Sequence, residues 1–555
     1  MPRILINEKD KTSPGTPSSY SNFSVLIVGF TGEDFVKYDA SLEEVVKKYE
    51  DNNLTKPDSN GVFEFSSAQA FKDTIGLVAP KKSIEIENGS IDIYHYGNQM
   101  AYELLNMGYS IVFKPITAIQ ELTDENFWEI FKDKASYDFR FITHGLLESS
   151  VLTDEDSYND VVQKLTDVEE AIALLEAINE QFKVDQAANP DLEEAEYKAD
   201  AYAEIKNNYP GFKSLVDGKV YTDYAAAVAG TNADKVSLEE TKNTLTAGGI
   251  TTEMINSANV NIANLATPPS EEVTGRTVPG RGDCIALIEL DEKVYAGNSL
   301  GANPENLIIS AISSMNGITA DNGKYCAMTV PSVHYKMADN KVFENNKKFP
   351  GAFHYLACFI NSLKLGFSEW YAAAGYTRGV SSYTIDHATV RLGEIAINAL
   401  EPRNYDDPQS DYPKFACNVI ANFRGSYYLW GNRTAHPLGK KGNLDTGDLV
   451  ASSFLNIRQL CTTIKKQLYT ACRTFTFDPN SDTLWVNFCN AIRPTLEAMK
   501  ADQGIRDYKI LKVYTDRKAT LKAKIRIIPI EAVEDFDLEV SLEDSFGETA
   551  AVVTE

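Results

Sequence analysis

The residues best suited to catalysis are a serine between two glycines and a histidine that follows an aspartate further along the chain. Gly297-Asn-Ser-Leu-Gly301 fits the G-x-S-x-G pattern of a nucleophile elbow, and Asp386-His387 comes later, in the order that α/β hydrolases use. The chemistry would be ester hydrolysis with Ser299 as nucleophile. An elbow needs its serine directly after a strand and at the start of a helix, however. Here Asp291-Glu-Lys293 separates the preceding strand from Ser299, and the next helix is expected only from Pro304.

Other motifs that carry chemistry are incomplete or badly placed. The chain has six histidines, none of which forms a pair spaced by four residues or a zinc-binding pattern: His95, His144, His334, His354, His387 and His436. Gly439-Lys-Lys-Gly442 lacks the first glycine and the Ser/Thr of a phosphate-binding loop. Arg281-Gly-Asp283 matches a cell-adhesion tripeptide, but it opens a predicted strand, and chance accounts for it. We therefore expect no cofactor, no metal and no enzymatic activity.

Charge, cysteine content and hydropathy restrict the function further. The 555 residues carry 53 basic and 79 acidic side chains, a net charge of −26, which would repel nucleic acid and anionic membranes. The most apolar long stretch, residues 351–376, is interrupted by His354, Lys364 and Glu369, which disfavours a membrane span. The seven cysteines form no C-x-x-C pair, so we expect reduced, buried thiols made in a cytoplasm. The first ten residues lack the features of an export signal.

The length predicts several packing units, and the periodicity predicts a multi-domain mixed α/β (α+β) fold. We divide the chain into an N-terminal arm and linker (1–20), an N-terminal α/β domain (21–150), an acidic helical insertion (151–280), a middle α/β domain (281–410), a C-terminal core domain (411–530) and an acidic C-terminal arm (531–555). The alternation of strands and helices in the three α/β domains indicates a partly parallel sheet.

Apolar spacing assigns an element type to most segments of these domains. Strands are predicted from Phe23 and over 110–115, 139–142, 284–290, 325–330, 418–423, 426–431, 508–514 and 521–527. Helices are predicted over 42–49, 97–107, 304–315, 351–365, 385–399, 453–474 and 484–501.

The insertion has its own composition. Residues 151–210 carry 16 acidic side chains against four lysines. One apolar stripe recurs at alternating spacings of four and three, which is typical of a helix with solvated acidic faces: Val161, Leu165, Val168, Ile172, Leu175 and Phe182. We expect two helices or a small bundle.

Both ends of the chain carry strand patterns that have no partner of their own. Near the C-terminus, Leu521, Ala523, Ile525 and Ile527 alternate with Lys522, Lys524 and Arg526, which gives one apolar and one basic face. Beyond it, where nine acidic and no basic residues follow from Glu531, the apolar positions alternate again: Phe536, Leu538, Val540 and Leu542. At the N-terminus, Arg3-Ile4-Leu5-Ile6 precedes a polar linker over 7–19.

An arm of this kind is stable only if it pairs with the edge of a sheet, because burial of its side chains barely offsets the cost of ordering it. Burying the four apolar side chains gains about 6 to 12 kcal/mol, and ordering seven residues costs about as much. Two alternatives follow: the arm pairs with a sheet of a neighbouring subunit, or it folds back on its own body as an edge strand.

The order of motifs resembles that of the tail sheath proteins of contractile bacteriophages, most closely over residues 415–535. The hairpin Asn418–Thr434 ends in Trp430-Gly431-Asn-Arg433-Thr434, which is similar to the family's Trp-Gly-x-Arg-Thr, and Leu455-Asn-Ile-Arg-Gln-Leu460 is similar to its helix start. Residues 474–494, with Leu484-Trp485, and residues 525–536 resemble its later steps. Residues 151–250 match no part of the pattern and fall where sheath proteins vary, so the resemblance implies that the insertion lies on the outer surface. Arg3-Ile-Leu-Ile6 replaces the family's usual Gly-Val-Tyr-Val opening.

The resemblance implies a subunit that stacks as hexameric rings in a helical tube around an inner tail tube. The tube of subunits would contract from a metastable extended state and drive the inner tube through the host envelope, without a nucleotide. It also implies strand donation between subunits by the arms. The charges add the hypothesis that the acidic C-terminal arm pairs with Lys522, Lys524 and Arg526, on the receiving or an adjacent face. The implied partners are copies of the chain, the tail tube protein, and baseplate and tail terminator proteins. The implied location is the virion tail, after synthesis in the host bacterial cytoplasm.

Two alternatives stay open. The same module could form the sheath of a phage-like injection particle or tailocin, which neighbouring genes for a capsid and a terminase would distinguish from a phage. The chain could instead be a cytoplasmic hydrolase that uses Ser299, in which case Ser299→Ala would abolish esterase activity.

Overall fold

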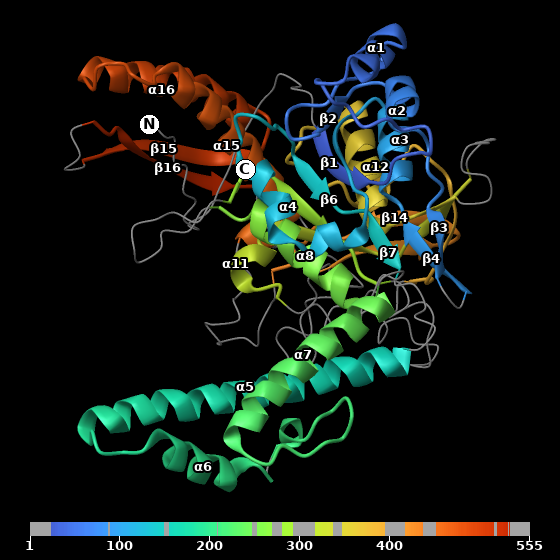
Figure 1. The fold of residues 1–555 in the computed structure, drawn as a ribbon. Coiled ribbons are helices and arrows are strands. Elements are labelled where there is room, and N and C mark those ends of the chain that lie inside the picture. Colours follow the sequence, from blue (N-terminus) through green and yellow to red (C-terminus); the bar gives the residue numbers. More distant parts are fainter. Residues whose placement is uncertain are drawn as a thin grey trace, which may run out of the picture.

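The computed structural model describes residues 24–86, 89–148, 155–207, 209–246, 252–268, 280–291, 317–336, 347–393, 417–436, 451–514, 519–530 and 532. The fold is mixed α and β and multi-domain, as the sequence predicts. Figure 1 shows a body built on a large sheet, a long helical projection, and a C-terminal unit of helices and a hairpin.

An eight-stranded sheet forms the body, in the order β14-β13-β9-β8-β6-β1-β5-β2. Its strands are β1 (Ser24–Gly29), β2 (Phe63–Phe65), β5 (Ser110–Pro115), β6 (Phe141–Thr143), β8 (Ile285–Ile288), β9 (Cys326–Val330), β13 (Asn418–Phe423) and β14 (Ser426–Trp430). The six central strands pair in parallel, and the outer strands β2 and β14 pair antiparallel. This confirms the predicted partly parallel sheet.

Helices cover both faces of this sheet, so its strands are apolar on both sides. In β1, Val25 and Ile27 join the core of one face, and Leu26 and Val28 join the core of the other. The first face packs against α2 (Ala68–Ile75), α3 (Gly97–Asn106) and α12 (Gly351–Lys364). The second packs against η1 (Ile119–Thr123), α4 (Glu125–Glu129), η2 (Ile130–Lys132) and α8 (Thr252–Ala266).

Smaller elements complete the body. They are α1 (Glu43–Asp51), α11 (Ala320–Gly323) and α13 (Gly375–Arg378), with two three-stranded sheets. One sheet has the order β3 (Lys81–Ile86), β4 (Gly89–His95), β7 (Leu146–Glu148), and the other has the order β11 (Lys348–Phe349), β10 (Val333–Tyr335), β12 (Ile385–Ala388).

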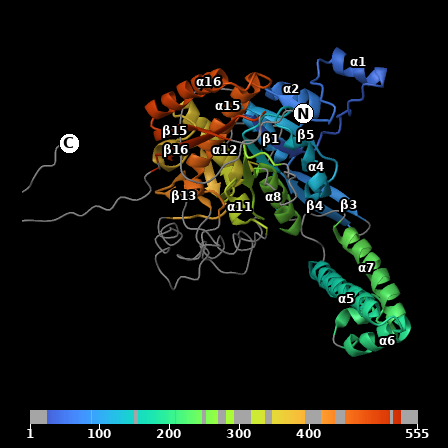
Figure 2. The ribbon, with the colours of Figure 1, turned by 90° about the vertical axis from the view of Figure 1, so that its left-hand side faces the viewer.

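The helical projection, residues 155–246, consists of α5 (Glu155–Ala188), α6 (Glu194–Ile205), η3 (Pro210–Phe212) and α7 (Tyr224–Thr246). Five residues of the predicted stripe are buried: Val161, Leu165, Val168, Leu175 and Phe182. The projection has two small cores of its own and extends away from the body in both views (Figures 1 and 2). The next helix, α8, belongs instead to the core of the large sheet.

The C-terminal unit, residues 451–530, contains η6 (Ala451–Ser453), α15 (Leu455–Thr474), α16 (Asp482–Ala501), β15 (Ile505–Val513) and β16 (Lys522–Pro529). Ser481 begins α16, because its hydroxyl accepts a hydrogen bond from the backbone N–H of Leu484. The start of α15 is buried from Leu455 to Leu460, whereas its last turns join a separate apolar core with α16 and the hairpin.

Most predicted strands and helices are confirmed within a few residues, but the helix predicted over 385–399 is wrong at its start. Ile385–Ala388 is strand β12, which pairs with β10, and this pairing outweighs the local helical spacing. Strands from the predicted N-terminal, middle and C-terminal core domains share the one large sheet. The boundaries between those units stay predictions.

The seven cysteines are free thiols, and five of them are buried. Among the helices of the described residues, none combines the length and the apolar content that a bilayer span requires. The predicted helix over 304–315 and both arms, with Ile4, Ile6, Phe536, Leu538, Val540 and Leu542, lie outside the described residues.

Candidate interaction site on the C-terminal unit

The hairpin β15–β16 has one face against its own helix and one face toward solvent. Its inner face packs on α16 through the apolar residues of the predicted alternation, including Ala523, Ile525 and Ile527. Its outer face carries exposed side chains from both strands: Lys509, Leu511, Lys522, Lys524, Arg526 and Ile528. The predicted apolar and basic faces of β16 are therefore confirmed.

Polar contacts fix this hairpin to α16. Lys512 contacts Asp482 at 2.8 Å, and the Tyr508 hydroxyl donates to Oε1 of Glu497 at 2.6 Å. In the part of the chain that the structure describes, the sheet contains β15 and β16 alone. Two-stranded hairpins are marginal by themselves and gain stability from a further strand at an edge. The arrangement can thus accept an added strand.

The charge of the C-terminal unit is opposite to that of the whole chain. Residues 451–530 carry 14 basic and 6 acidic side chains, a net charge of +8, whereas the chain as a whole has −26. The helical projection, residues 155–246, carries 20 acidic and 8 basic side chains, a net charge of −12. The outer face of the hairpin is therefore suited to an acidic segment.

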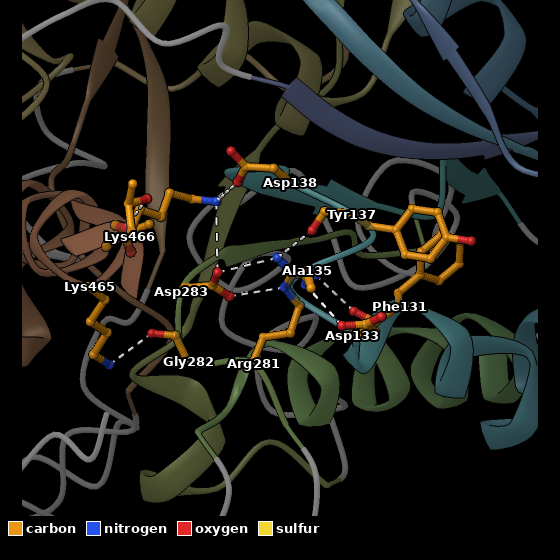
Figure 3. A network of polar contacts seen from close by, with 12 residues as sticks. Phe131, Asp133, Ala135, Tyr137, Asp138, Arg281, Gly282, Asp283, Lys465 and Lys466 are labelled. Atoms are coloured by element: carbon orange, nitrogen blue, oxygen red, sulfur yellow. Dashed lines mark hydrogen bonds and ion pairs between the residues drawn. The ribbon is translucent and has the colours of Figure 1, made fainter. Parts of the chain in front are cut away.

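A buried network holds α15 against the large sheet (Figure 3). Arg281 donates from Nε to Asp283 Oδ1 at 2.9 Å, and its two terminal nitrogens donate to the carbonyl oxygens of Phe131 at 2.9 Å and Tyr137 at 2.8 Å. Lys466 of α15 pairs with Asp138 and lies 3.8 Å from Asp283. Burial alone would raise the pKa of Asp283, but the charges of Arg281 and the nearby lysines outweigh it and lower that pKa.

The same network explains the Arg281-Gly-Asp283 tripeptide. The Arg281 side chain is fully buried, with its guanidinium 4.1 Å from the centre of the Phe139 ring. Lys465 donates to the carbonyl oxygen of Gly282 at 2.8 Å, so the glycine too is joined to α15. The three residues serve as a joint inside the molecule and are not available to an adhesion receptor.

A second ion pair, which hydrogen-bonds to α15, joins that helix to the same body. Arg140, directly before β6, pairs with Glu369 at 2.6 Å and donates to the carbonyl oxygen of Gln459 at 2.9 Å. Thr463 also contacts both members of the pair. Buried charges that are paired on several sides fix geometry. The first turns of α15 are thus rigidly attached to the sheet, and they carry the hairpin with them.

The residues of the family-like signature make packing and capping contacts. Trp430 packs edge-to-face on Phe423, with ring centres 4.8 Å apart, and the Arg433 guanidinium lies 4.5 Å from the centre of the Phe454 ring. A side chain at Gly431 would approach the Cα of Asn418 to 2.9 Å. Thr434 donates to the carbonyl oxygen of Ser452 at 3.0 Å. Trp485 stacks on Phe488 within α16, at 5.8 Å.

The hydrolase residues do not form a described site. Ser299 lies outside the described residues. Asp386 and His387 lie on exposed positions of β12, 3.2 Å apart, and the His387 ring stacks on His334 at 4.1 Å. Across the described ranges, no group of three histidine, cysteine or acidic side chains could hold a metal ion.

Sequence reasoning missed a buried polar cluster where β6 and β8 end. His144 accepts from the backbone N–H of Leu146 at Nδ1, so its Nε2 donates to Oδ1 of Asn259 at 2.8 Å. Asn259 Oδ1 also accepts from the backbone N–H of Glu289 at 2.9 Å, and the Thr143 hydroxyl donates to the Glu289 carboxyl at 2.7 Å. Polar residues at the carboxyl ends of two predicted strands could have indicated it.

This cluster lies where α/β sheets often bind ligands, at the carboxyl ends of parallel strands. His144, Asn259 and Glu289 are all buried, however, so a solute has no access to them. Burial lowers the pKa of His144 to about 4 and raises the pKa of Glu289 to about 8, so both are neutral at pH 7. The cluster joins α8 to the sheet and offers no charged catalytic group.

Comparisons with known proteins give little beyond this geometry. No protein-family model and no curated protein matches the chain. One solved structure similar to it is the six-fold symmetrised cryo-EM structure of the anti-feeding prophage baseplate. The similarity covers 98% of this chain and 99% of that chain, with 11% sequence identity and a TM-score of 0.46. A likeness of this size carries no functional argument.

Proposed function

We propose that the chain is the sheath subunit of a contractile tail, which polymerises as stacked hexameric rings around a tail tube and contracts to drive that tube through a host envelope. The observation that carries the proposal is the hairpin β15–β16, two strands with a basic outer face, in a chain whose acidic C-terminal arm has strand periodicity. The motifs that resemble the sheath family coincide with β13, β14, α15, α16 and β16, which lead up to this hairpin in the chain and include its second strand.

Strand donation between subunits is the assembly step. A donated arm gains ladder hydrogen bonds that it lacks alone, and its acidic residues meet Lys522, Lys524 and Arg526 of the receiving hairpin. Contacts of this head-to-tail kind generate rings where the rotation closes and open helical tubes where it does not, so they can build stacked rings. The N-terminal arm, with Ile4 and Ile6, would donate in the same way.

The rigid attachment of α15 suits a contracting lattice. Arg140 donates to the carbonyl oxygen of Gln459, and Lys465 and Lys466 of the same helix contact Gly282 and Asp283. Because these contacts hold α15 on the large sheet, the hairpin and the sheet would move as one body. The linkers of the arms then absorb the movement between subunits while the strand pairing persists. The energy is stored in the assembly, so no catalytic residue, cofactor or nucleotide is needed.

The proposed partners are other copies of the chain, the tail tube protein, and baseplate and tail terminator proteins, without nucleic acid or membrane. The proposed location is the virion, after assembly in the bacterial cytoplasm. The same architecture would serve the sheath of a phage-like injection particle or tailocin, and neighbouring genes for a capsid and a terminase would assign the chain to a phage.

Negative-stain electron microscopy of the purified chain, beside a truncation that lacks residues 531–555, tests the proposal. We expect rings or tubes from the full chain and their loss in the truncation. Single particles from both chains would contradict strand-donating assembly. In that case, an esterase assay of the wild-type chain and of Ser299→Ala tests the hydrolase alternative.

A further inference from the structure

The turn between α15 and α16 holds an aromatic residue in a backbone conformation that favours glycine. Phe477 has φ of +78°, in the left-handed region that bulky residues rarely adopt. The turn is closed by main-chain bonds, such as that from the Asp478 N–H to the carbonyl oxygen of Phe475 at 3.2 Å. These bonds need no side chain at residue 477, so the fold itself gives no reason for a phenylalanine here.

The side chain of Phe477 is also little covered by the part of the chain that the structure describes. It is 86% exposed, so the strained backbone presents an apolar ring to water. Both the backbone conformation and the exposure disfavour phenylalanine in the isolated subunit. Strain retained at one residue points to a function outside the local fold.

Two more exposed apolar side chains lie at the same end of the C-terminal unit. The contact of Lys512 with Asp482 places the end of β15 beside the start of α16, which follows the turn of Phe477. Tyr514, directly after β15, is 92% exposed, and Val486 of α16 is 53% exposed. We call Phe477, Val486 and Tyr514 the distal tip. Figure 1 shows α16 and the hairpin extending together away from the large sheet.

The distribution of charge along the chain favours a second copy of the chain as the partner of this tip. The tip belongs to a unit of net charge +8, whereas the remainder of the chain carries −34. Two copies of the chain therefore attract each other when the basic unit of one meets the acidic remainder of the next. Aromatic residues are enriched at protein interfaces and are frequent anchors of them.

We propose that the distal tip is a docking surface for a second copy of this chain, with Phe477 as its aromatic anchor. The proposal rests on the self-assembly proposed above but concerns a contact other than the arms. It adds a fixed contact between bodies to the tethered contact of a donated strand.

Phe477→Gly in the full-length chain tests it, because glycine adopts the left-handed conformation freely. We expect an unchanged or higher melting temperature and an assembly that needs at least about tenfold more protein, measured by sedimentation velocity and electron microscopy. Gln503→Gly is the matched control. Gln503 is also exposed and has φ of +52° in the same unit, but it presents no aromatic ring.

A second full-length variant, Leu538→Asp with Val540→Asp, disables the C-terminal arm and separates the two proposals. We expect it to form no tubes but to retain a salt-sensitive association at low ionic strength, which Phe477→Gly then removes.

Wild-type assembly by Phe477→Gly would overturn the docking surface and leave the sheath proposal intact. If the arm variant forms normal tubes and Phe477→Gly forms none, strand donation by the C-terminal arm is overturned and the docking surface is supported. A wild-type chain that stays monomeric, or that binds only a different acidic protein through Phe477, would overturn the second copy as partner.

Discussion

Glu289 shows how one buried carboxyl group affects the stability of the whole body. Its Oε1 accepts from Thr143, its Oε2 has no hydrogen-bond partner among the described residues, and burial raises its pKa to about 8. The pKa in the folded chain is thus above the ordinary value of 4.5. The favourable contribution is therefore complete below about pH 4.5 and is lost as the pH rises through about 8.

We predict that Glu289→Gln, which keeps the shape without the titration, raises the melting temperature at pH 8 by about 2 to 5 °C. The difference should become small near pH 5, which is close to the ordinary pKa of the carboxyl group in the unfolded chain. Thermal unfolding followed by circular dichroism from pH 5 to pH 8 measures this, with the exposed Glu44→Gln as control. An equal pH dependence in wild type and Glu289→Gln would contradict the assigned protonation.

Residues differ in how far their position could be predicted from the sequence. The alternation of Ile525 and Ile527 with Lys524 and Arg526 is local, so it predicts the two faces of β16 directly. The contacts of Arg281 with Phe131 and of Lys466 with Asp283 are not local, because they join residues 150 and 183 positions apart in the chain. Sequence spacing therefore identified the basic face but could not identify the network that holds it in place.

Elements whose apolar pattern is consistent over their whole length were predicted well, whereas the conformation of shorter segments depended on the strands that they pair with. Helix α15 and strand β13 begin and end close to their predicted bounds because each has a consistent apolar pattern. Strand β12 has four residues, and its pairing with β10 decides its conformation. Element type is thus predictable where the local pattern and the tertiary contacts agree.

The helical projection should unfold independently of the body, because its two cores contain residues of the projection alone. We predict that Val168→Asp, which places a charge in one of these cores, lowers the first of two thermal transitions and leaves the second unchanged. The matched control on the same helix is Val184→Asp, since Val184 is exposed. Hydrogen exchange should locate the effect in residues 155–246. A loss of protection in the large sheet would show that the two parts are coupled.

For the whole molecule, the separation of charge is the feature that most affects association. The C-terminal unit is basic and the remainder strongly acidic, so copies should attract each other at low ionic strength and lose that attraction as salt rises.

We therefore predict that raising salt from about 0.05 to 0.5 M weakens assembly several-fold. The triple variant Lys522→Glu, Lys524→Glu and Arg526→Glu should assemble poorly at both ionic strengths. Light scattering against protein concentration measures both effects, and a triple variant of the projection, Lys183→Glu, Lys206→Glu and Lys219→Glu, controls for net charge. Salt-independent assembly would contradict charge pairing between subunits.

The most direct test of the central claim, that the C-terminal arm crosses to a neighbouring subunit, is cross-linking between two differently labelled chains. One chain carries Val540→Cys in the arm, the other carries Lys524→Cys on the hairpin, and a short bismaleimide is added after mixing. The unsubstituted chain controls for its own cysteines. Strand donation predicts covalent dimers that contain one chain of each kind. Cross-links that form only within a single chain carrying both substitutions, and never between chains, would show that the arm folds back on its own body and would contradict the account.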